Sequence, residues 1–547
     1  MRSDSSGMQD STGLEPLYSE AQIRAVETAA QATLPPHALM LRAAEAAATL
    51  AMRLIAQQAV PVAIETGTRP SCVLIAAGTG NNGGDALECA VLLAGRGCAV
   101  TVLMPVPPAL SASSNDHRLA LENMHALGDS IECLHGIAVL DALTLRSWDL
   151  VIDGLFGIGL TRSLADPWQA VVAMLNSIDS PLLALDVPSG LDADTGTIRV
   201  DPVSGQRGAC IRASHTLTFI GDKPGLRTGS GREYAGHVTI AALDIDPTLF
   251  PTPTAVMNGP AAFPQIGEAR RQDSHKGTYG DVVVIGGASG MAGAAILAAQ
   301  AALKSGCGRV TIGFAEQGNA PAVIPGQPEL MCRSAVDVDL STATCVVGPG
   351  LGQSPAAIML VERACDAMAP LVLDADALNL AAASTALAAR VASRRGPTLM
   401  TPHPLEAARL LGVSVAAIES DRLGAAGEIA RRFCAVVILK GSGTIITDGQ
   451  QILVNPTGNP ALATGGTGDA LAGICGALLA QGWLPMPAAA GAVWLHGAAA
   501  DWLVGQGIGP IGVTASEIID AARIVRNRMS SKYQMIQIMP PAPAGRP

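Results

Sequence analysis

The chain has 547 residues, of which 49% are hydrophobic and 15% charged, and its formal net charge is −11 at pH 7. This length exceeds one ordinary hydrophobic core and predicts two to four domains. The acidic balance, with no basic cluster, argues against a nucleic-acid partner. The 11 cysteines show neither CxxC nor Cys/His spacing, so neither a zinc site nor a disulfide framework is indicated.

No segment suits a membrane or a secretory signal. The polar N-terminus lacks the apolar segment of a signal peptide. The most apolar region, residues 471–504, is interrupted by polar residues and prolines and contains no run of about 18 apolar residues. We therefore expect a soluble, cytoplasmic protein without a membrane partner. Residues 1–16 and 534–547 are expected to be disordered.

In the first half, short apolar strands end in glycine-rich or polar loops. The pattern predicts helices within 17–58, then a strand at 72–77, a loop at 78–85, a helix at 86–94 and a strand at 99–104. Later strands at 150–152 and 182–185 are followed directly by Asp153 and Asp186. Because the carboxyl ends of parallel strands meet at one crevice, these loops are expected to converge on a polar site.

Two features of this half leave their roles open. Gly78, Gly80 and Gly83 satisfy GxGxxG, but no acidic residue ends the following strand, so an ordinary NAD-dependent dehydrogenase is not indicated. Lys223 follows another apolar run, residues 215–220. It either neutralises a phosphate or is a solvated lysine in a turn.

A proline-rich stretch separates the two halves and predicts a linker at 251–265, between domains at 17–250 and 266–533. In the second half, apolar strands alternate with helices, and nearly every strand ends in a polar or glycine-rich loop. This pattern predicts a doubly wound α/β domain with its ligand site at the strand ends. The expected strands are 282–285, 309–313, 345–347, 371–373, 398–400 and 436–439.

The run TGGTGD at residues 464–469 leads directly into an apolar helix expected at 470–480. Glycines at a helix N-terminus let unpaired backbone N–H groups approach an anion. A carboxylate beside such a site repels the ligand unless it has a chemical role, so we interpret Asp469 as a general base acting on a hydroxyl that attacks a terminal phosphate. The alternative is an ordinary acidic residue near a helix start. His403 and Lys440 each fit either a ligand contact or a local structural role.

These motifs resemble a known family along nearly the whole chain. The second half is similar to the NAD(P)H-hydrate dehydratases of the ribokinase-like fold, through KGTYG at 276–280, GPGLG at 348–352, LDADALN at 373–379, TPHP at 401–404 and the segment 455–469. The first half resembles the NAD(P)H-hydrate epimerases, through GNNGGD at 80–85, DGLFG at 153–157 and DVPSG at 186–190. In this comparison Ala86 stands where glycine is usual, and Val187 replaces the commoner isoleucine.

The resemblance implies an α/β protein of two domains, a Rossmann-like sandwich followed by a ribokinase-like domain. The first would interconvert the R and S hydrates of NADH and NADPH, called NADHX and NADPHX. The second would dehydrate the S form with ADP, by phosphorylating the ring hydroxyl and eliminating phosphate. ADP, Mg²⁺ with the nucleotide, K⁺ in the epimerase site and a homo-oligomer are the implied cofactors and partners.

The same resemblance assigns the candidate site residues. The catalytic residues are Asp469 and Asp186. The substrate-binding residues of the first half are Asn81, Asn82, Gly83, Gly84, Asp85, Gly157, Ile158, Gly159, Leu160, Thr161, Arg162, Ser163 and Asp186, and those of the second half are Ala295 (or its neighbour Ala294), Gly350, Gly352, His403 and Asp469. The nucleotide-binding residues are Lys440, Gly441, Ser442, Gly443, Thr444, Gly465, Gly466, Thr467 and Gly468, and the K⁺ ligands are Asn82, Asp153 and Ser189.

Two other interpretations remain open. In the first, the chain is a ribokinase-type small-molecule kinase with an accessory N-terminal binding domain. In the second, the first half is a binding module without activity. The kinase shares residues 465–469 but leaves the Asn81–Asn82 loop and residues 186–190 unexplained. Retention of Asn82, Asp153 and Asp186 speaks against an inactive module.

Overall fold

The computed structural model describes residues 13–58, 69–106, 114–160, 162–200, 205–316, 318 and 320–530. The chain divides into two compact units, one spanning Glu15–Ala255 and the other beginning at Val256. This division falls inside the stretch predicted as a linker. Of the ends predicted to be disordered, residues 1–12 and 534–547 lie outside the described residues; the prediction was wrong for residues 13–16, where Leu14 is buried and Pro16 begins a short strand.

The first unit is built on a parallel sheet in the order β4-β3-β2-β5-β6-β7-β8. The register is continuous: Ile75 of β2 pairs with Val102 of β3 on one side and Ile152 of β5 on the other. The strands predicted at 72–77, 99–104 and 182–185 are confirmed at the same bounds. The strands are β2 (Cys72–Ala77), β3 (Ala99–Met104), β4 (Ile131–His135), β5 (Leu150–Gly154), β6 (Leu182–Leu185), β7 (His215–Phe219) and β8 (His237–Ala241).

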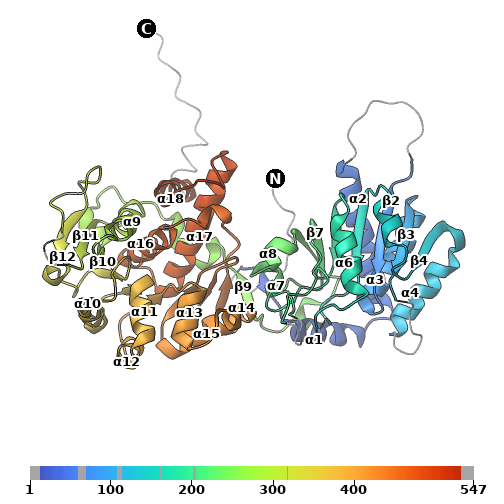
Figure 1. Ribbon diagram of the computed structural model, residues 1–547, viewed down its shortest axis with the longest axis horizontal. Helices are drawn as coiled ribbons and strands as arrows, with labels where there is room; N and C mark the ends of the chain where they lie inside the picture. The colour runs from blue at the N-terminus through green and yellow to red at the C-terminus, as the bar shows by residue number, and fades with distance from the viewer. Residues whose placement is uncertain are drawn as a thin grey trace, which may run out of the picture. The chain divides into compact units, whose positions relative to one another are not determined.

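Helices cover both faces of this sheet (Figure 1). Alternate residues of β2 show the two cores: Val73 and Ile75 pack with α1 to α4, whereas Leu74 and Ala76 pack with α5 and α6. Burial on both faces explains why these strands are continuously apolar rather than alternating. The helices are α1 (Glu20–Gln31), α2 (Ala38–Gln58), α3 (Asn81–Gly95), α4 (Asn115–Ala126), α5 (Leu140–Thr144), α6 (Trp168–Ser177), α7 (Pro224–Arg227) and α8 (Gly231–Tyr234).

The second unit contains a mixed sheet in which the strands β9-β18-β17-β16-β15-β14-β13-β10-β11-β12 lie in that order. Its pairs are parallel from β12 to β16, and β17 then pairs antiparallel with both β16 and β18. The strands are β9 (Ala255–Met257), β10 (Asp281–Gly286), β11 (Arg309–Phe314), β12 (Met331–Ser334), β13 (Thr344–Val347), β14 (Leu371–Leu373), β15 (Thr398–Met400), β16 (Val436–Leu439), β17 (Ile445–Thr447) and β18 (Ile452–Val454).

Part of the predicted linker belongs to this second fold. Val256 and Met257 of β9 pair with β18, and Phe263 is completely buried in the core of the second unit. The prolines of this stretch begin short 3₁₀ turns at Pro260 and Pro264 instead of keeping the chain extended. Residues 255–263 therefore do not behave as a solvated spacer.

Helices lie along both sides of the second sheet (Figure 1). One side carries α9, α16, α17 and α18, whose apolar residues form a single core with the strands. The helices are α9 (Ala292–Lys304), α10 (Pro355–Asp366), α11 (Ala375–Ala383), α12 (Thr385–Ala392), α13 (Pro404–Leu411), α14 (Val415–Ser420), α15 (Arg422–Phe433), α16 (Thr467–Ala480), α17 (Pro485–Gly505) and α18 (Ala515–Met529).

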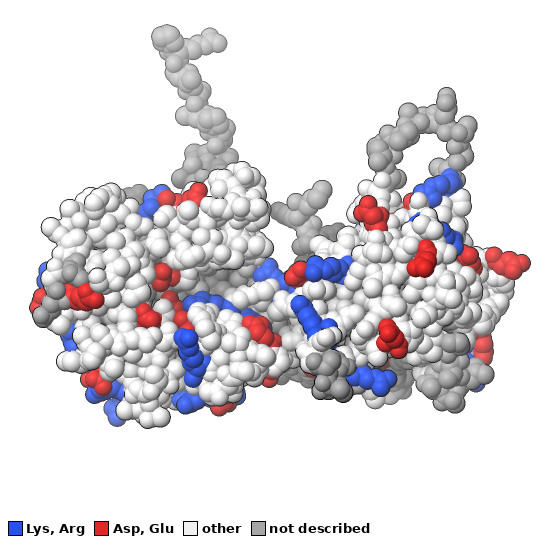
Figure 2. Space-filling model, in the orientation of Figure 1, with Lys and Arg blue, Asp and Glu red and all other residues white. Residues whose placement is uncertain are grey.

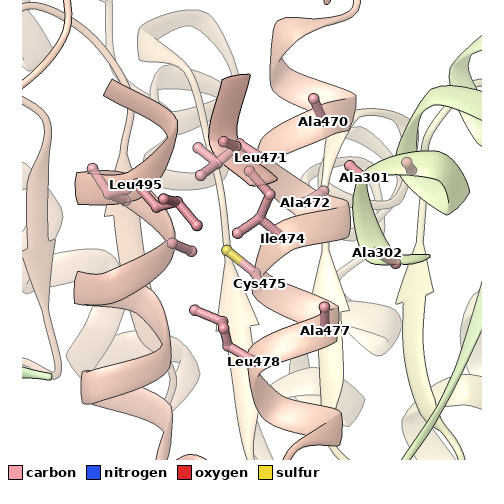
Figure 3. Packing of buried hydrophobic residues seen from close by; sticks show 14 of the residues in the cluster. Ala301, Ala302, Ala470, Leu471, Ala472, Ile474, Cys475, Ala477, Leu478 and Leu495 are labelled. Atoms are coloured by element: carbon pink, nitrogen blue, oxygen red, sulfur yellow. The ribbon is translucent and has the colours of Figure 1, made fainter. Parts of the chain in front are cut away.

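Helix α16 is the buried centre of this layer, packed between α9 and α17 (Figure 3). Its small residues allow a close approach, because a Cβ on Gly473 would lie only 2.0 Å from the carbonyl oxygen of Ala298 on α9. The predicted helix is confirmed, but it begins at Thr467 rather than at residue 470. Asp469 is therefore inside the first turn.

The charged groups of the described chain are dispersed. On the face drawn in Figure 2, Lys and Arg side chains are interspersed with Asp and Glu over a largely uncharged surface. Within the described ranges, no helix combines the length and the apolar character that a membrane span requires.

Candidate functional sites

In the first unit, the loop after β2 turns directly into α3. Helix α3 begins at Asn81, so the prediction of a loop through residue 85 was wrong, and Asn81, Asn82 and Asp85 belong to the first helical turns. The turn is tight: a Cβ on Gly78 would lie 1.9 Å from the carbonyl oxygen of Leu155. The glycines therefore bring the start of α3 against the loop that follows β5.

Three oxygen-bearing side chains meet at this edge of the sheet. Asp153, fully buried at the end of β5, accepts hydrogen bonds from the backbone N–H of Ser189 (2.9 Å) and from its hydroxyl (2.7 Å). Burial raises the pKa of Asp153 to about 6, against the opposing effect of the Ser189 hydrogen bonds. Asn82 donates to the carbonyl of Leu185 at 3.2 Å, and its buried Oδ1 has no hydrogen-bond partner.

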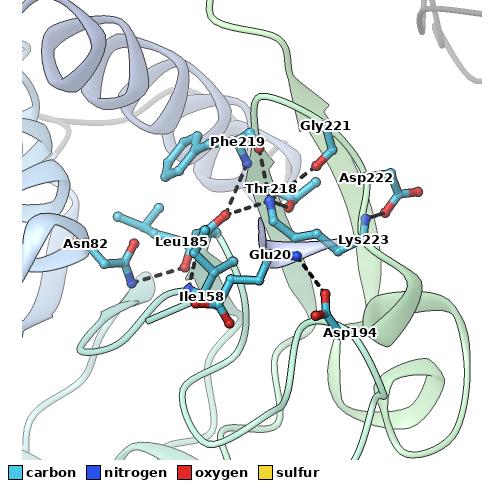
Figure 4. Close-up of polar contacts among 11 residues, drawn as sticks. Glu20, Asn82, Ile158, Leu185, Asp194, Thr218, Phe219, Gly221, Asp222 and Lys223 are labelled. Atoms are coloured by element: carbon cyan, nitrogen blue, oxygen red, sulfur yellow. Dashed lines mark hydrogen bonds and ion pairs between the residues drawn. The ribbon is translucent and has the colours of Figure 1, made fainter. Parts of the chain in front are cut away.

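Asp186 lies next to this cluster and is paired with Lys223, whose surroundings are shown in Figure 4. Asp186 has a left-handed backbone, with φ of 65°. Its Oδ1 accepts a hydrogen bond from Lys223 Nζ at 2.8 Å, and its Oδ2 accepts one from the backbone N–H of Ile158 at 3.1 Å. A rare backbone conformation fixed by several contacts is a feature that concentrates at functional sites.

Lys223 contradicts both of its sequence-based interpretations, because its side chain is completely buried. Besides Asp186, Nζ donates to Thr218 Oγ1 at 2.7 Å, to the carbonyl of Phe219 at 2.9 Å and to that of Gly221 at 3.2 Å. The ammonium group is thus committed to protein acceptors and is neither solvated nor free to bind phosphate. Its position behind Asp186 was hidden in the sequence because the two residues are 37 positions apart.

A cavity of about 350 Å³ opens beside Asp186. Of the predicted residues, it is lined by Asn81, Asn82, Asp85, Gly157, Ile158, Gly159, Leu160 and Asp186. Gly83 and Gly84 are buried, and neither they nor Arg162 and Ser163 are among the residues lining this cavity. Thr161 lies outside the described residues.

Helix α1 and Asp116 also contribute to the cavity, and sequence reasoning missed them. Arg24 and Glu27 of α1 line the cavity, although neither belongs to a recognisable sequence motif. Asp116, in the first turn of α4, lines it as well. Only the helical spacing of buried Ile23, Val26 and Ala30 signalled that α1 has an inner face. Nothing in that pattern indicates which polar residues border a ligand.

In the second unit, Asp469 projects from the first turn of α16 beside a glycine N-cap, Gly466, with φ of 90°. Burial raises the pKa of Asp469 to about 6; the charge of Asp374 adds to the rise, and Lys440 opposes it. His496 of α17 lies near Thr467 at the start of α16. Burial lowers the pKa of His496 to about 4, so its ring is neutral at pH 7. Unpaired amides of the first helical turn and a partly buried carboxylate therefore lie together.

Lys440 lies at the same place, and it was the lysine predicted to contact the nucleotide. Its Nζ donates to Asp374 Oδ1 at 2.9 Å and would lie 3.5 Å from a Cβ on Gly468. Asp374, which is 1% exposed, also accepts from the Thr401 hydroxyl at 2.7 Å. Burial lowers the pKa of Lys440, but the carboxylates of Asp374 and Glu406 outweigh it, so the net shift is upward. Lys440 therefore carries a positive charge next to Gly468, at the N-terminus of α16.

His403 is the N-cap of α13. Its Nδ1 accepts the backbone N–H groups of Leu405 (3.1 Å) and Glu406 (3.3 Å), while the Glu406 carboxylate accepts the N–H of His403 at 2.8 Å. Burial raises the pKa of Glu406 to about 7 although Lys440 opposes the shift. The capping role is thus observed, and the ring, about half exposed, remains accessible to a ligand.

The loop after β13 faces the start of α9. Gly350 has φ of 57°, and a Cβ there would lie 2.6 Å from the carbonyl oxygen of Met291. The N–H of Gly352 donates to Asp376 Oδ2 at 2.8 Å. Ala295 is fully buried, so of the two predicted alanines only Ala294 has accessible surface.

The predicted nucleotide loop, residues 440–444, joins β16 to β17. The hydroxyl of Thr444 donates to the carbonyl of Gly441 at 3.0 Å, which closes the turn. Behind it, buried Arg422 donates to the carbonyls of Leu439 and Lys440. Sequence reasoning singled out Lys440 but not the supporting groups Asp374, Asp376, Glu406 and Arg422; the first three follow or lie near strand ends, which was the available signal.

Family models match both units. Residues 36–225 match the YjeF-related protein N-terminus, and residues 282–523 match the NAD(P)H-hydrate dehydratase family. The chain is 36% identical over 524 residues to the bifunctional NAD(P)H-hydrate repair enzyme Nnr of Coxiella burnetii, covering 93% of this chain and 99% of that protein.

The chain belongs to the bifunctional NAD(P)H-hydrate repair enzymes. The second unit by itself is similar to the ADP-dependent (S)-NAD(P)H-hydrate dehydratase of Neisseria meningitidis, at 45% identity over 49% of this chain and 92% of that protein. A solved structure, the ADP/ATP-dependent NAD(P)H-hydrate dehydratase of Bacillus subtilis co-crystallised with ATP/Mg²⁺, is 35% identical over 48% of this chain and 94% of that chain, with a TM-score of 0.44. The predicted family is confirmed.

Proposed function

We propose that the second site performs the family's ADP-dependent dehydration with Asp469 as its base. The supporting observation is the placement of a partly buried carboxylate, with a pKa of about 6, beside the open amides of α16 and the Lys440 ammonium. At pH 7 this group is mostly ionised and yet more basic than an ordinary aspartate. A base works best when its pKa lies near the operating pH.

The chemistry needs two proton transfers and one phosphoryl transfer. Asp469 takes the proton of the C6 hydroxyl of the S-hydrate as the oxygen attacks the β-phosphorus of ADP, and AMP leaves. In the phosphorylated intermediate the C6–O bond then breaks with its electron pair going to phosphate, the departing phosphate takes the C5 proton, and the C5–C6 double bond forms. The products are NAD(P)H, AMP and inorganic phosphate.

Two kinds of group would stabilise the charge on the moving phosphate. The amides of Gly465, Gly466 and Gly468 and the Lys440 ammonium lie beside the α16 N-terminus, where they would contact a bound anion, whereas the Thr467 N–H donates to the carbonyl of Thr464. Mg²⁺ accompanying the nucleotide fits this place, because the buried carboxylates of Asp374 and Glu406 share the single ammonium of Lys440. A bound Mg²⁺ would neutralise phosphate charge.

The first site would interconvert the R and S hydrates, with Asp186 contacting the hydrated ring in the 350 Å³ cavity. Asn82, Asp153 and Ser189 fit K⁺, since all three donors are oxygens and the buried Asn82 Oδ1 lacks a hydrogen-bond partner. The ion would supply positive charge that orders the loops after β5 and β6. A homo-oligomer and a cytoplasmic location remain predictions.

The test is incubation of the purified full chain with mixed R and S hydrates and ADP, followed by absorbance of the reduced nicotinamide. Full recovery supports both activities, and recovery of the S fraction alone would remove the epimerase from the proposal. A stable phosphorylated product without recovered NAD(P)H would instead establish the kinase alternative. The same reaction with ATP compares the two nucleotides.

A further inference from the structure

Helix α1 forms one wall of the first cavity although it precedes residue 36, where the family match begins. The helix is firmly placed: Ser19 forms a capping box with Gln22, and Ile23 and Val26 are buried. The backbone N–H of Glu20 donates to Asp194 Oδ1 at 2.7 Å (Figure 4). A polar residue on the cavity side of α1 is therefore held at a defined position.

Glu27 is such a residue, and it shares the cavity with Asp186. The groups that face Glu27 are Asp186 after β6, Asp116 on α4, Asp85 on α3 and Arg24 on its own helix, with buried Lys223 behind Asp186. Burial raises the pKa of Glu27, the charges of Asp186 and Asp116 add to the rise, and Arg24 and Lys223 oppose it. Glu27 is thus more easily protonated than an ordinary glutamate.

Interconversion of the epimers at C6 by ring opening uses two proton-transfer groups. The carbon carries both a hydroxyl group and the ring nitrogen N1, so the stereocentre is lost when the C6–N1 bond opens to an aldehyde. Opening needs a base for the hydroxyl proton and an acid for N1, and closure on the other face needs the same groups in exchanged roles. Asp186, paired with Lys223, supplies only one of them.

We propose that Glu27 is the second proton-transfer group of the first site, working with Asp186 on opposite parts of the same ring. The proposal rests on the proposed epimerase function of this site. Asp186 takes the hydroxyl proton, the C6–N1 bond breaks with its electron pair going to N1, and N1 receives the proton of Glu27. After rotation about C5–C6, N1 attacks the other face of the aldehyde and returns its proton to Glu27, while Asp186 protonates the new hydroxyl oxygen.

Asp85 and Asp116 are the competing carboxyl groups of the cavity. Burial, with the charges of Asp186 and Glu27, raises the pKa of Asp85 well above its ordinary value, so this group gives up its proton less readily than an ordinary aspartate. The Oδ1 atom of Asp116 lies 3.5 Å from Nδ1 of His37, the residue before α2. The Asp116 carboxylate therefore points towards His37. Glu27 has a longer side chain than the aspartates of the cavity. It is only partly buried, and its raised pKa suits repeated proton transfer.

The test compares Glu27→Gln with Glu122→Gln, an exposed position on α4 outside the cavity. Each full-length variant is given purified S-hydrate without nucleotide, and formation of the R form is followed by chromatography. We expect Glu27→Gln to lose about 10²–10⁴-fold in interconversion, the usual value of a positioned acid. ADP-dependent dehydration of the S-hydrate should be unchanged, and Glu122→Gln should match the parent protein.

The pH profile separates proton transfer from a structural effect. In the parent protein, interconversion should fall on the alkaline side as Glu27 loses its proton, and Glu27→Gln should lack that limb. Retained interconversion in Glu27→Gln, or a loss confined to Asp85→Asn, would overturn the assignment. If the parent protein itself does not interconvert the hydrates, the proposed epimerase function fails instead.

Discussion

The two sites each contain a lysine paired with a buried aspartate, yet the two lysines have different surroundings. Lys223 has a fully buried side chain and donates to four protein oxygens. The side chain of Lys440 is 19% exposed and lies beside Gly468 at the α16 N-terminus. Their partners, Asp186 and Asp374, both follow parallel strands.

This difference shows that burial decides what a lysine at a strand end can do. Lys223 has no donor directed to a ligand, so its charge serves the Asp186 carboxylate and the loop around it. Lys440 keeps accessible surface next to open amides, so its charge is available to a phosphate. The same pair of residue types therefore positions a carboxylate in one unit, and under the proposed function it would support anion binding in the other.

The largest expected effect is on Asp186 itself. Asp186→Ala should abolish interconversion of R and S hydrates, because it removes the carboxylate that borders the cavity, while S-hydrate dehydration persists. Both rates are measured on the same preparation, with Asp186→Asn as the variant of matched shape. A parallel loss of both activities in a folded protein would contradict a division of labour between the units.

Replacing the two lysines tests the comparison directly. Lys223→Met should destabilise the first unit by about 3–5 kcal/mol, because it leaves Asp186 as an uncompensated buried charge. Lys440→Met should destabilise the second unit for the same reason, because it leaves the buried Asp374 without its cation, and it should in addition weaken nucleotide-dependent turnover. Urea unfolding of both variants measures the stabilities. Full nucleotide-dependent turnover by a folded Lys440→Met protein would contradict the different roles given to the two lysines.

The acid limb of the dehydration rate should report Asp469. The pKa of this group is raised to about 6, and only its deprotonated form acts as a base, so the rate should rise with pH through about 6 and level off above it. Below that point we expect about a tenfold loss per pH unit. Rates of S-hydrate dehydration at saturating ADP between pH 5 and pH 8 provide the measurement, and a flat profile would argue against the assignment.

A smaller effect should follow removal of K⁺. Exchange of K⁺ for tetramethylammonium should lower interconversion roughly tenfold, the scale seen for groups that orient a site around a metal, and leave dehydration unaffected. Asn82→Ala should make the interconversion rate independent of K⁺. A K⁺ requirement confined to dehydration would indicate that the ion acts in the second unit and would contradict its assignment to the first.

Sequence reasoning located most of the parallel strands, but not β4, β8 or β12, and the acidic residues that follow several of them, because buried parallel strands are continuously apolar and often end in glycine or aspartate. It did not find the antiparallel strands β17 and β18. It also misplaced the start of α3, since Gly83 and Gly84 argue against a helix until tertiary packing favours one. Lys223 and Glu27 are both distant in sequence from Asp186, so no local pattern links either of them to it. Their places near Asp186 could be found only from the structure.

The most direct measurement of the central claim is single-turnover dehydration of S-hydrate by Asp469→Asn with saturating ADP. We predict a rate lower by about 10²–10⁴-fold, nucleotide affinity close to that of the parent protein, and unchanged interconversion of R and S hydrates. Full turnover by Asp469→Asn would contradict the account, because the carboxylate beside the α16 amides would then not be the base.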